Sequence, residues 1–519
     1  MTAPSRLNSL GHAIAHGMLG MHEEPGRGTF QDGAMVGVRR PLTMRSSKTN
    51  PRGDGTLVAT RHPSPDRRLG TTLWVRVAVV VGMAVATVVS VMSGISWAEG
   101  ASRSEIYLPI AVFVAFGVLA VALTRFDIYL AGSVAARASL DVAKLTSDGG
   151  ASGLDITGVF AIAFVGFGIL WLIAQRPLKA NWSPLVLPLV ALILLAVLSI
   201  MFTPQVSRGL REVSRLGAIL VLLLILQQFL TTRRHQKLIL GAVFMSAVIP
   251  LAVAARQMFT QSGLFVAGGF ERVTGTFTHP NPFATYLVMM IILAIAVLPA
   301  MNRWWRVALA VLILASGWAL LLTYTRSAWI AVLAGLLVVG FLHRGVVFPI
   351  LGVILVVGVL AIPTVAGRFA DLSDSTTASG QPVNSLEWRV QTWEQALSSV
   401  SNPVTGMGLR SSDQLTEANK LPHNDFVRMY VELGVVGLLV YLWLIASSWR
   451  LAAESLRVSS DKLGRGLAMG FAGVATAFLV LSLASNLMSQ LVLLWYFAIV
   501  AALAWSVKVT APESAEMVS

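Results

Sequence analysis

Long apolar runs recur along most of this chain of 519 residues, and they restrict it to proteins that are embedded in a lipid bilayer. A helix needs about 20 apolar residues to cross the hydrocarbon region of a membrane, because each residue adds only about 1.5 Å. Charged residues make up 12% of the sequence, which is roughly half of the share that soluble domains carry. The sequence therefore predicts an all-α, polytopic integral membrane protein.

We count 14 candidate spans, of which 13 are clear. The clear ones are Leu73–Val91, Ile106–Leu123, Leu154–Ala174, Leu185–Phe202, Val213–Leu230, Leu238–Ala255, Phe283–Leu298, Val307–Leu322, Ala328–Leu342, Val346–Pro363, Phe426–Trp449, Gly466–Leu483 and Leu487–Val507. The weaker candidate, Phe126–Leu145, is interrupted by Asp127, Arg137 and Asp141. Whether this segment crosses decides the orientation of every loop that follows it.

Five short loops between these segments are basic, and they indicate which side of the membrane faces the cytoplasm. They contain, in order, Arg176 and Lys179; Arg233, Arg234 and Lys237; Arg303 and Arg306; Arg344; and Arg450, Arg457, Lys462 and Arg465. With a basic cytoplasmic N-terminus, all five lie inside only if Phe126–Leu145 also crosses. We therefore predict about 14 spans with both termini inside, or 12 to 13 if weak segments are re-entrant.

This orientation divides the chain into five parts. Residues 1–71 are rich in Gly, Pro, Ser and Arg, and they predict a disordered, basic cytoplasmic tail. Residues 72–363 and 426–508 form the transmembrane bundle, residues 364–425 a long extracytoplasmic loop, and residues 509–519 a short cytoplasmic tail. The net charge of +14 resides in the first tail and at span ends, so we expect membrane lipid and no nucleic acid as a partner.

Histidines are rare on the predicted outer side. Of the eight in the chain, only His279 and His423 lie in segments that face outward. His423 belongs to "LPHND", immediately before a span, where Asn424 or Asp425 can cap the new helix. Capping does not explain His423, whose imidazole can accept a proton from an attacking hydroxyl group.

His279 occupies a similar place in "GTFTHPNPFATYL". Asn281 followed by Pro282 favours an N-cap with proline at the first helical position. Capping is therefore the favoured explanation for this stretch, and His279 is a secondary candidate for the functional site.

Two groups of arginines also face outward in this topology. Arg326 lies in the tight turn Tyr324–Ser327 between two apolar segments. Arg208, Arg211 and Arg215 are spaced i, i+3 and i+7, which places them on one helical face. A guanidinium group binds phosphate in a bidentate manner and is always charged, so both groups are candidates for binding a polyanion. The alternative is that these side chains only reach toward lipid headgroups.

The long outer loop contains a predicted amphipathic helix. Its apolar residues, Leu386, Val390, Trp393, Leu397 and Val400, recur at helical spacing. Such a helix can lie along the membrane surface as a lid over a site, or it can serve as a structural cap on the bundle. The outward segments carry no Asp-x-Asp pair and no His/Glu cluster with metal-ligand spacing, so we expect neither a metal ion nor a cofactor.

Three stretches, taken in order, resemble the O-antigen ligase and O-antigen polymerase superfamily. They are "GTFTHPNPFATYL", "TYTRSAW", and "WRVQTWEQALSSVSNPVTGMG" followed by "HNDFVRMYVELGVVG". The resemblance extends from about Arg208 to Trp505. It implies an enzyme of the bacterial plasma membrane that transfers a glycan from a polyprenyl-diphosphate carrier to an acceptor on the outer face, without metal or nucleotide sugar. The acceptor is a lipid, a protein or a wall glycan.

The resemblance also assigns roles to particular residues. Arg326 and Arg389 match arginines that are implicated in binding the diphosphate, and His423 matches the histidine that is implicated in activating the acceptor. We further expect Arg208, Arg211, Arg215, His279 and Asn424 to contribute to substrate binding. Two alternatives remain at this point: elongation of a carrier-linked glycan, as in O-antigen polymerases, and transport of a lipid-linked glycan by a multi-span flippase.

Overall fold

The computed structural model describes residues 87, 88, 91, 103–141, 156–175, 178, 181–203, 205–267, 270–343, 385–415 and 421–510. The chain separates into two units, residues 1–76 and 77–519, and all described residues belong to the second. The predicted tail 1–71, the predicted span Val346–Pro363, residues 364–384 of the outer loop and nearly all of Leu73–Val91 lie outside the described residues.

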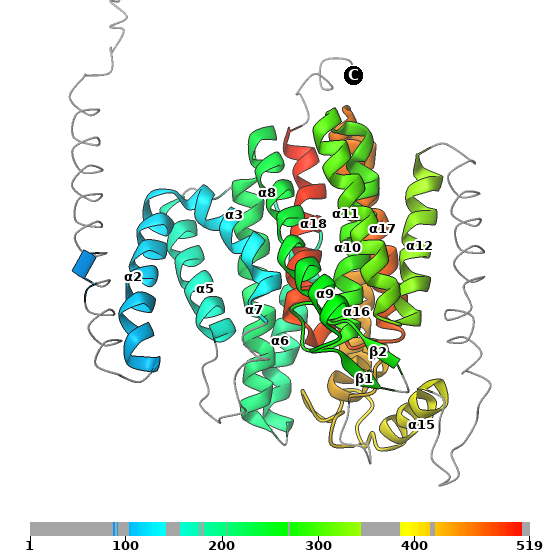
Figure 1. Ribbon diagram of the computed structural model, residues 1–519. Helices are drawn as coiled ribbons and strands as arrows, with labels where there is room; N and C mark the ends of the chain where they lie inside the picture. Colours follow the sequence, from blue (N-terminus) through cyan, green and yellow to red (C-terminus); the bar gives the residue numbers. More distant parts are fainter. Residues whose placement is uncertain are drawn as a thin grey trace, which may run out of the picture. The chain divides into compact units, whose positions relative to one another are not determined.

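Helices dominate the described part of the chain (Figure 1). They are α2 Arg103–Thr124, α3 Phe126–Ala136, α5 Ile156–Ala174, α6 Val186–Ser199, α7 Val206–Phe229, α8 Arg233–Met245, α9 Val248–Thr260, α10 Pro280–Val297, α11 Arg303–Leu322, α12 Arg326–Leu342, α15 Ser385–Ser398, α16 Asp425–Val458, α17 Lys462–Ser482 and α18 Leu491–Thr510. Short 3-10 helices are η1 Arg137–Ser139, η2 Ile200–Phe202, η3 Leu298–Ala300 and η4 Leu487–Ser489.

One small sheet departs from the predicted all-α fold. Strands β1 Phe265–Ala267 and β2 Phe270–Arg272 pair antiparallel, with Phe265 opposite Arg272. This hairpin lies between the predicted spans Leu238–Ala255 and Phe283–Leu298, in the connection that faces outward in the predicted topology. A pair of strands this short is too weak to stand alone, and its last residue is fastened to the helical bundle by hydrogen bonds described below.

Seven apolar helical segments in the described residues are long enough to cross a bilayer. They are Thr157–Ala174, Arg233–Thr260, Pro280–Ala300, Arg303–Leu322, Asp425–Val458, Lys462–Ser482 and Leu491–Thr510. Four shorter apolar helices accompany them: Phe113–Thr124, Phe126–Ala136, Val186–Phe202 and Arg326–Leu342. A helical, polytopic membrane protein is thereby confirmed, whereas the total of about 14 spans stays a prediction.

Hydrogen bonds and ion pairs sort the helix ends into two groups. At one end, here called the site end, Thr203 contacts Leu409, Glu212 contacts Arg428, Arg272 contacts Thr323, and Asp425 contacts Leu487. At the opposite, basic end, Ser183 contacts Gln227, Arg233 contacts Asp461, and Arg465 contacts Leu342. The segments that were predicted to face outward thus meet at the site end, and basic loops meet at the other.

The weak candidate Phe126–Leu145 runs between these two ends. Phe126 stacks on Trp171 near the basic end, with ring centroids 4.5 Å apart. Toward the site end, the Ala138 amide donates to the Tyr496 hydroxyl (3.2 Å). However, α3 has 11 residues and η1 has 3, which together rise about 20 Å, against the roughly 30 Å of a bilayer core. The segment thus runs from the basic end toward the site end, as a crossing requires, but its helical part is shorter than the predicted span.

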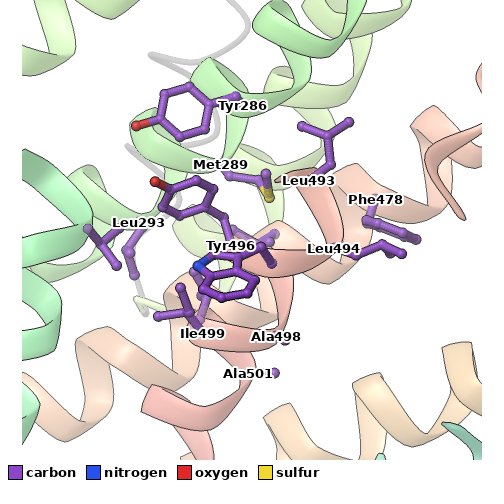
Figure 2. Packing of buried hydrophobic residues seen from close by; sticks show 14 of the residues in the cluster. Tyr286, Met289, Leu293, Phe478, Leu493, Leu494, Tyr496, Ala498, Ile499 and Ala501 are labelled. Carbon is purple, nitrogen blue, oxygen red and sulfur yellow. The ribbon is translucent and has the colours of Figure 1, made fainter. Parts of the chain in front are cut away.

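The core of the described bundle is formed by α10, α17 and α18, where long stretches of each helix are buried. Figure 2 shows Tyr286 of α10 beside Tyr496 of α18, and their ring centroids are 5.0 Å apart. The Tyr496 hydroxyl donates to the Val134 carbonyl (2.8 Å), which fastens α3 to this core. Buried hydroxyl groups in a membrane protein need such partners, because lipid offers none.

Small residues bring α12 and α17 into backbone contact. A Cβ atom added to Gly335 would lie 2.7 Å from the Gly473 carbonyl oxygen. Helix pairs in membranes use small residues in this way, since lipid gives them no hydrophobic drive to associate. The two helices are antiparallel, because Arg465 near the start of α17 contacts Leu342 at the end of α12. The first residue of α12, Arg326, and the last residue of α17, Ser482, therefore both lie at the site end.

The sidedness of the two ends can be tested with reporter fusions. We expect reporters after Thr232, Asn302 and Ser459 to indicate the cytoplasm, because these positions adjoin the basic loops. Reporters after Gln261 and Gly380 should indicate the outside. The measurement is the ratio of an alkaline phosphatase to a green fluorescent protein signal at each position. A cytoplasmic signal at Gln261 or Gly380 would contradict the predicted topology.

Candidate functional site

The structure has a turn between two apolar helices at Thr323–Thr325, and Arg326, which was predicted inside the turn, is the first residue of the next helix. Helix α11 ends at Leu322 and α12 begins at Arg326. Tyr324, in the middle of the turn, adopts φ +48° and packs against Phe270 of the hairpin, with ring centroids 5.0 Å apart. Arg326 is half-buried at the first position of its helix, where the positive end of the helix dipole adds to the guanidinium charge.

Arg272 holds this turn in place, and the sequence analysis did not single it out. Its Nε donates to the Thr323 carbonyl (2.6 Å), and its Nη2 donates to Asn281 Oδ1 (2.9 Å) and Thr325 Oγ1 (3.0 Å). The side chain is buried, so these charge-assisted hydrogen bonds are among the strong ones. One signal was available: Arg272 is an arginine in a predicted outer segment, against the usual charge bias.

The start of α10 corrects the predicted cap. His279, and not Asn281, is the N-cap residue, and its Nδ1 accepts a hydrogen bond from the Asn281 amide (3.1 Å). Pro280 takes the first helical position, where a fixed φ suits the helix. Asn281 is thereby free to accept from Arg272. Burial, together with the nearby Arg272 charge, lowers the pKa of His279 to about 4.

This pKa has a consequence for stability. Because the folded protein holds His279 neutral while the unfolded chain protonates it near pH 6.5, stability is complete above that pH and falls as pH drops toward 4. Because His279 is only half-buried, we expect the free energy of unfolding to fall by about 1 to 2 kcal/mol, which is less than the full pKa shift would imply. We expect His279→Asn, which retains a good cap, to reduce the change in melting temperature between pH 7.5 and pH 5. An unchanged pH dependence would show that other groups cause it.

The predicted amphipathic helix is confirmed as α15, and it lies against the His423 loop. Trp393 Nε1 donates to the Pro422 carbonyl (2.5 Å). The Trp388 ring meets the His423 ring edge to face, with centroids 5.8 Å apart. Arg389 follows Trp388 directly and is half-buried, and burial lowers its pKa without removing its charge at neutral pH. The structure therefore brings Arg389 and His423 into one neighbourhood.

Part of the apolar face of α15 does not pack on the described protein. Val390 and Leu397 are 39% and 41% exposed, whereas Thr392 and Ala396 are buried. A helix with one side on the protein and an apolar strip beside it is suited to lie in the membrane interface. This arrangement agrees with a lid at the lipid surface better than with a cap that buries its apolar stripe in the bundle.

His423 is held in an unusual backbone conformation, with φ +51°. Residues other than glycine rarely adopt a left-handed conformation, and they do so where the surroundings enforce it. Here the carbonyl before it accepts from Trp393, and Asn424 after it begins α16. The backbone of His423 is thus held on both sides, and its imidazole is half-buried.

Asn424 is the cap of α16, as one of the two predicted options. Its Oδ1 accepts from the amides of Phe426 (2.9 Å) and Val427 (3.2 Å). Asp425 has a different role from the predicted one: its fully buried carboxylate accepts from the amides of Leu487 (2.9 Å) and Met488 (3.3 Å) in η4. It joins α16 to the turn that follows α17.

The two residues should therefore differ in how much stability they supply. Asn424→Ala removes a cap and should cost about 1 kcal/mol. Asp425→Ala leaves two buried amides without an acceptor and should cost about 2 to 4 kcal/mol, because each unsatisfied group costs about 1 to 3 kcal/mol. Asp425→Asn, which keeps one acceptor oxygen, should fall between them. Thermal unfolding of the purified variants measures the order, and equal losses at both positions would contradict it.

The arginines at the start of α7 are engaged within the protein. Arg208 pairs with Asp413 (3.2 Å) and Arg215 pairs with Glu212 (3.1 Å). Arg211 is exposed, and its Nε donates to the Ser207 carbonyl (3.3 Å). Two of the three charges are thus opposed by carboxylates, which weakens the expectation that all three bind a polyanion together.

A buried ion network lies beside them, and the sequence analysis missed it. Arg428 contacts Glu212 (2.8 Å), Glu432 (3.1 Å) and Ser489 (2.5 Å), and Ser412 also donates to Glu432 (2.6 Å). Ionisable residues inside membrane helices are usually paired in this manner. The available signal was Arg428 and Glu432 at i and i+4 near the start of an apolar span. The network joins α7, α16, the loop before α16 and η4.

The site end thus holds two groups of predicted residues. His279 and Arg326 lie at the starts of α10 and α12, which Arg272 links through Asn281 and Thr325. Arg389, His423 and Asn424 lie where α15 meets α16. Helix α17 connects the groups, because it packs along α12 and its last turn leads to η4. Within the described ranges, no three His, Asp or Glu side chains are grouped as metal ligands. The arrangement offers guanidinium groups and two imidazoles, which suits charge stabilisation and proton transfer.

Comparison with known families adds one finding. Residues 309–442 match a family model described as O-Antigen ligase. This segment begins in α11, ends in α16, and contains Arg326, Arg389, His423 and Asn424. A search of curated proteins finds no match to the chain.

Proposed function

We propose that this chain, whose residues 309–442 match a family model described as O-Antigen ligase, transfers a glycan from a polyprenyl-diphosphate carrier to an acceptor hydroxyl or amine. The transfer takes place on the outer face of the bacterial plasma membrane and needs no metal ion. One observation carries this proposal: α15, which contains Arg389, contacts the His423 loop through Trp388 and Trp393, at the same end of the bundle as Arg326.

In the proposed reaction, His423 is the general base. It accepts the proton of the acceptor group while the acceptor oxygen or nitrogen forms a bond to the anomeric carbon of the glycan. The bond between that carbon and the diphosphate oxygen breaks, and the electron pair leaves with the diphosphate. Attack from the face opposite the leaving group inverts the anomeric configuration. The proton on His423 then passes to solvent.

Arg326 and Arg389 stabilise the leaving diphosphate. Charge accumulates on the bridging oxygen as the bond breaks, and fixed cations at that place lower the barrier without reorganising. The hydrogen bonds of Arg272 to the turn support a fixed position for Arg326. His279 is less suited to act as the base, because its pKa of about 4 makes it a weak acceptor at neutral pH and its Nδ1 already serves as a cap.

The exposed apolar strip of α15 supports a site at the boundary between lipid and water. Val390 and Leu397 can rest in the membrane interface, so a polyprenyl tail need not leave the bilayer while its diphosphate meets the arginines. A transport pathway is less well supported. Among the described helices, Arg137 pairs with Asp141, and Arg428 pairs with Glu212 and Glu432; all five side chains are buried.

The proposal can be tested with purified protein in vesicles that contain a carrier-linked glycan. A lipid acceptor in one reaction and a second carrier-linked glycan in another distinguish ligation from elongation by the product that forms. We expect transfer to continue undiminished in excess EDTA. Loss of activity that Mg²⁺ or Mn²⁺ restores would indicate a different mechanism, and no transfer to either acceptor would contradict the proposed class.

A further inference from the structure

A cavity of about 470 Å³ opens at the basic end, opposite the site end. Its polar lining contains Arg233, Lys237 and Lys462, and its apolar lining includes Leu240, Phe244 and Trp305. None of these residues takes part in the proposed transfer reaction. The cavity is therefore a second concave surface with its own chemistry.

Positive charge in this cavity exceeds negative charge. The carboxylate among its lining residues, Asp461, accepts from Arg233 Nη2 (2.6 Å) and from the Gly464 amide (3.1 Å). Lys237 and Lys462 are exposed, and neither forms a hydrogen bond or ion pair to the described part of the chain. Helices α8, α11 and α17 all begin at this cavity, and their dipoles add to its positive potential. This positive potential favours the binding of a phosphate group.

The lining changes from charged to apolar along one face of α8. Arg233, Lys237, Leu240, Gly241 and Phe244 recur at helical spacing, so they lie on the same side of the helix. The cations occupy its first turns, at the membrane surface, and Leu240 and Phe244 lie deeper. Trp305, which is 44% exposed, is the kind of residue that marks the membrane interface. A phospholipid changes in the same order, from a charged headgroup to apolar acyl chains.

We propose that this cavity binds one anionic phospholipid, with its phosphate between Arg233, Lys237 and Lys462 and an acyl chain along Leu240 and Phe244. Basic pockets between transmembrane helices are suited to anionic headgroups. The inference is independent of the transfer reaction, because it rests on the opposite end of the bundle. Its partner is a structural lipid of the membrane in which the protein resides.

Native mass spectrometry of the full chain in detergent, titrated with dioleoylphosphatidylglycerol, measures the first bound lipid. We expect Lys237→Gln with Lys462→Gln to weaken this binding about 10- to 30-fold, since each cation near a lipid surface contributes on the order of 1 kcal/mol. The matched control is Arg234→Gln with Arg457→Gln, which removes the same charge from exposed positions outside the cavity lining and should change the affinity less than about 3-fold.

Gly241→Leu tests the apolar half without changing charge. A Cβ atom at Gly241 would have no atom within 4 Å, and leucine favours a helix over glycine, so the variant should fold while its side chain fills the cavity. We expect it to weaken phosphatidylglycerol binding at least about 10-fold, because the acyl chain loses its place.

Two further probes decide between sources of the phosphate. Dioleoylphosphatidylcholine, with the same chains and no net charge, should bind at least about 10-fold more weakly, and glycerol 3-phosphate should not displace the lipid. Equal binding of both lipids, or unchanged binding in the Lys237/Lys462 double variant or in Gly241→Leu, would overturn the proposal. Displacement by glycerol 3-phosphate at similar concentration would replace the lipid with a soluble phosphate ester and overturn it as well.

Discussion

Arg326→Ala and Arg389→Ala should each lower glycan transfer by about 10²- to 10³-fold, because a fixed charge donor to a developing anion contributes that much to turnover. Arg326→Lys should recover only part of the loss, since an ammonium group cannot bind two phosphate oxygens in the planar manner of a guanidinium. The measurement is initial rate of product formation from a carrier-linked donor, with melting temperature recorded for each variant.

Arg208→Ala is the matched control for this experiment. Arg208 lies at the same end of the bundle and is half exposed, but its charge is opposed by Asp413. Asp413 also pairs with Arg410 (3.0 Å) and so keeps a cationic partner when Arg208 is removed. We therefore expect at most a several-fold effect on apparent donor affinity. Full activity in Arg326→Ala, with unchanged stability, would show that this arginine only reaches toward headgroups and would remove it from the diphosphate site.

Replacement of His423 should also have a large effect, because a positioned general base contributes roughly 10²- to 10⁴-fold to turnover. The backbone at this position favours asparagine over alanine as the test residue. His423 has φ +51°, and alanine would add about 1 kcal/mol of strain there, whereas asparagine tolerates the left-handed region and is not a base. We therefore expect His423→Asn to retain its melting temperature and to lose most of its turnover.

His279→Asn is the corresponding control at the second outward-facing histidine. It keeps the cap of α10 and should retain most of the activity, because His279 is a poor base at neutral pH. Normal turnover in His423→Asn would transfer the role of base to His279. Activity in the double variant would contradict histidine base catalysis in this protein altogether.

Several elements could be predicted from the sequence because their signals are local. Apolar runs of about 20 residues, the spacing of Leu386, Val390 and Trp393, and the polar turn before Arg326 each predict a helix or a break within a few residues of the signal. Asn424 as a cap belongs to the same class, since its partners are the next amides in the chain. The motifs that indicate the superfamily also lie in short stretches, and residues 309–442 contain most of them.

Other features depend on partners that are distant in sequence. Arg272 reaches Thr323, 51 residues away, and Asp425 reaches Leu487, 62 residues away. Arg208 meets Asp413 across 205 residues. A side chain that caps its own helix and one that joins another segment can have the same local sequence, as Asn424 and Asp425 illustrate. The choice between them follows from which buried amides lack an acceptor after the helices have packed.

The sequence by itself determined that this chain is a bundle of membrane helices with its conspicuous polar residues at helix ends, because a lipid bilayer admits few other arrangements of such a pattern. Only the tertiary structure decided which of those residues work together. It gave the cap of α10 to His279, paired two of the three arginines of α7 with carboxylates, and brought α15 against the loop of His423 through Trp388 and Trp393. The physical reason is that hydrogen bonds and ion pairs are satisfied wherever packing brings donors and acceptors together, whatever their separation along the chain.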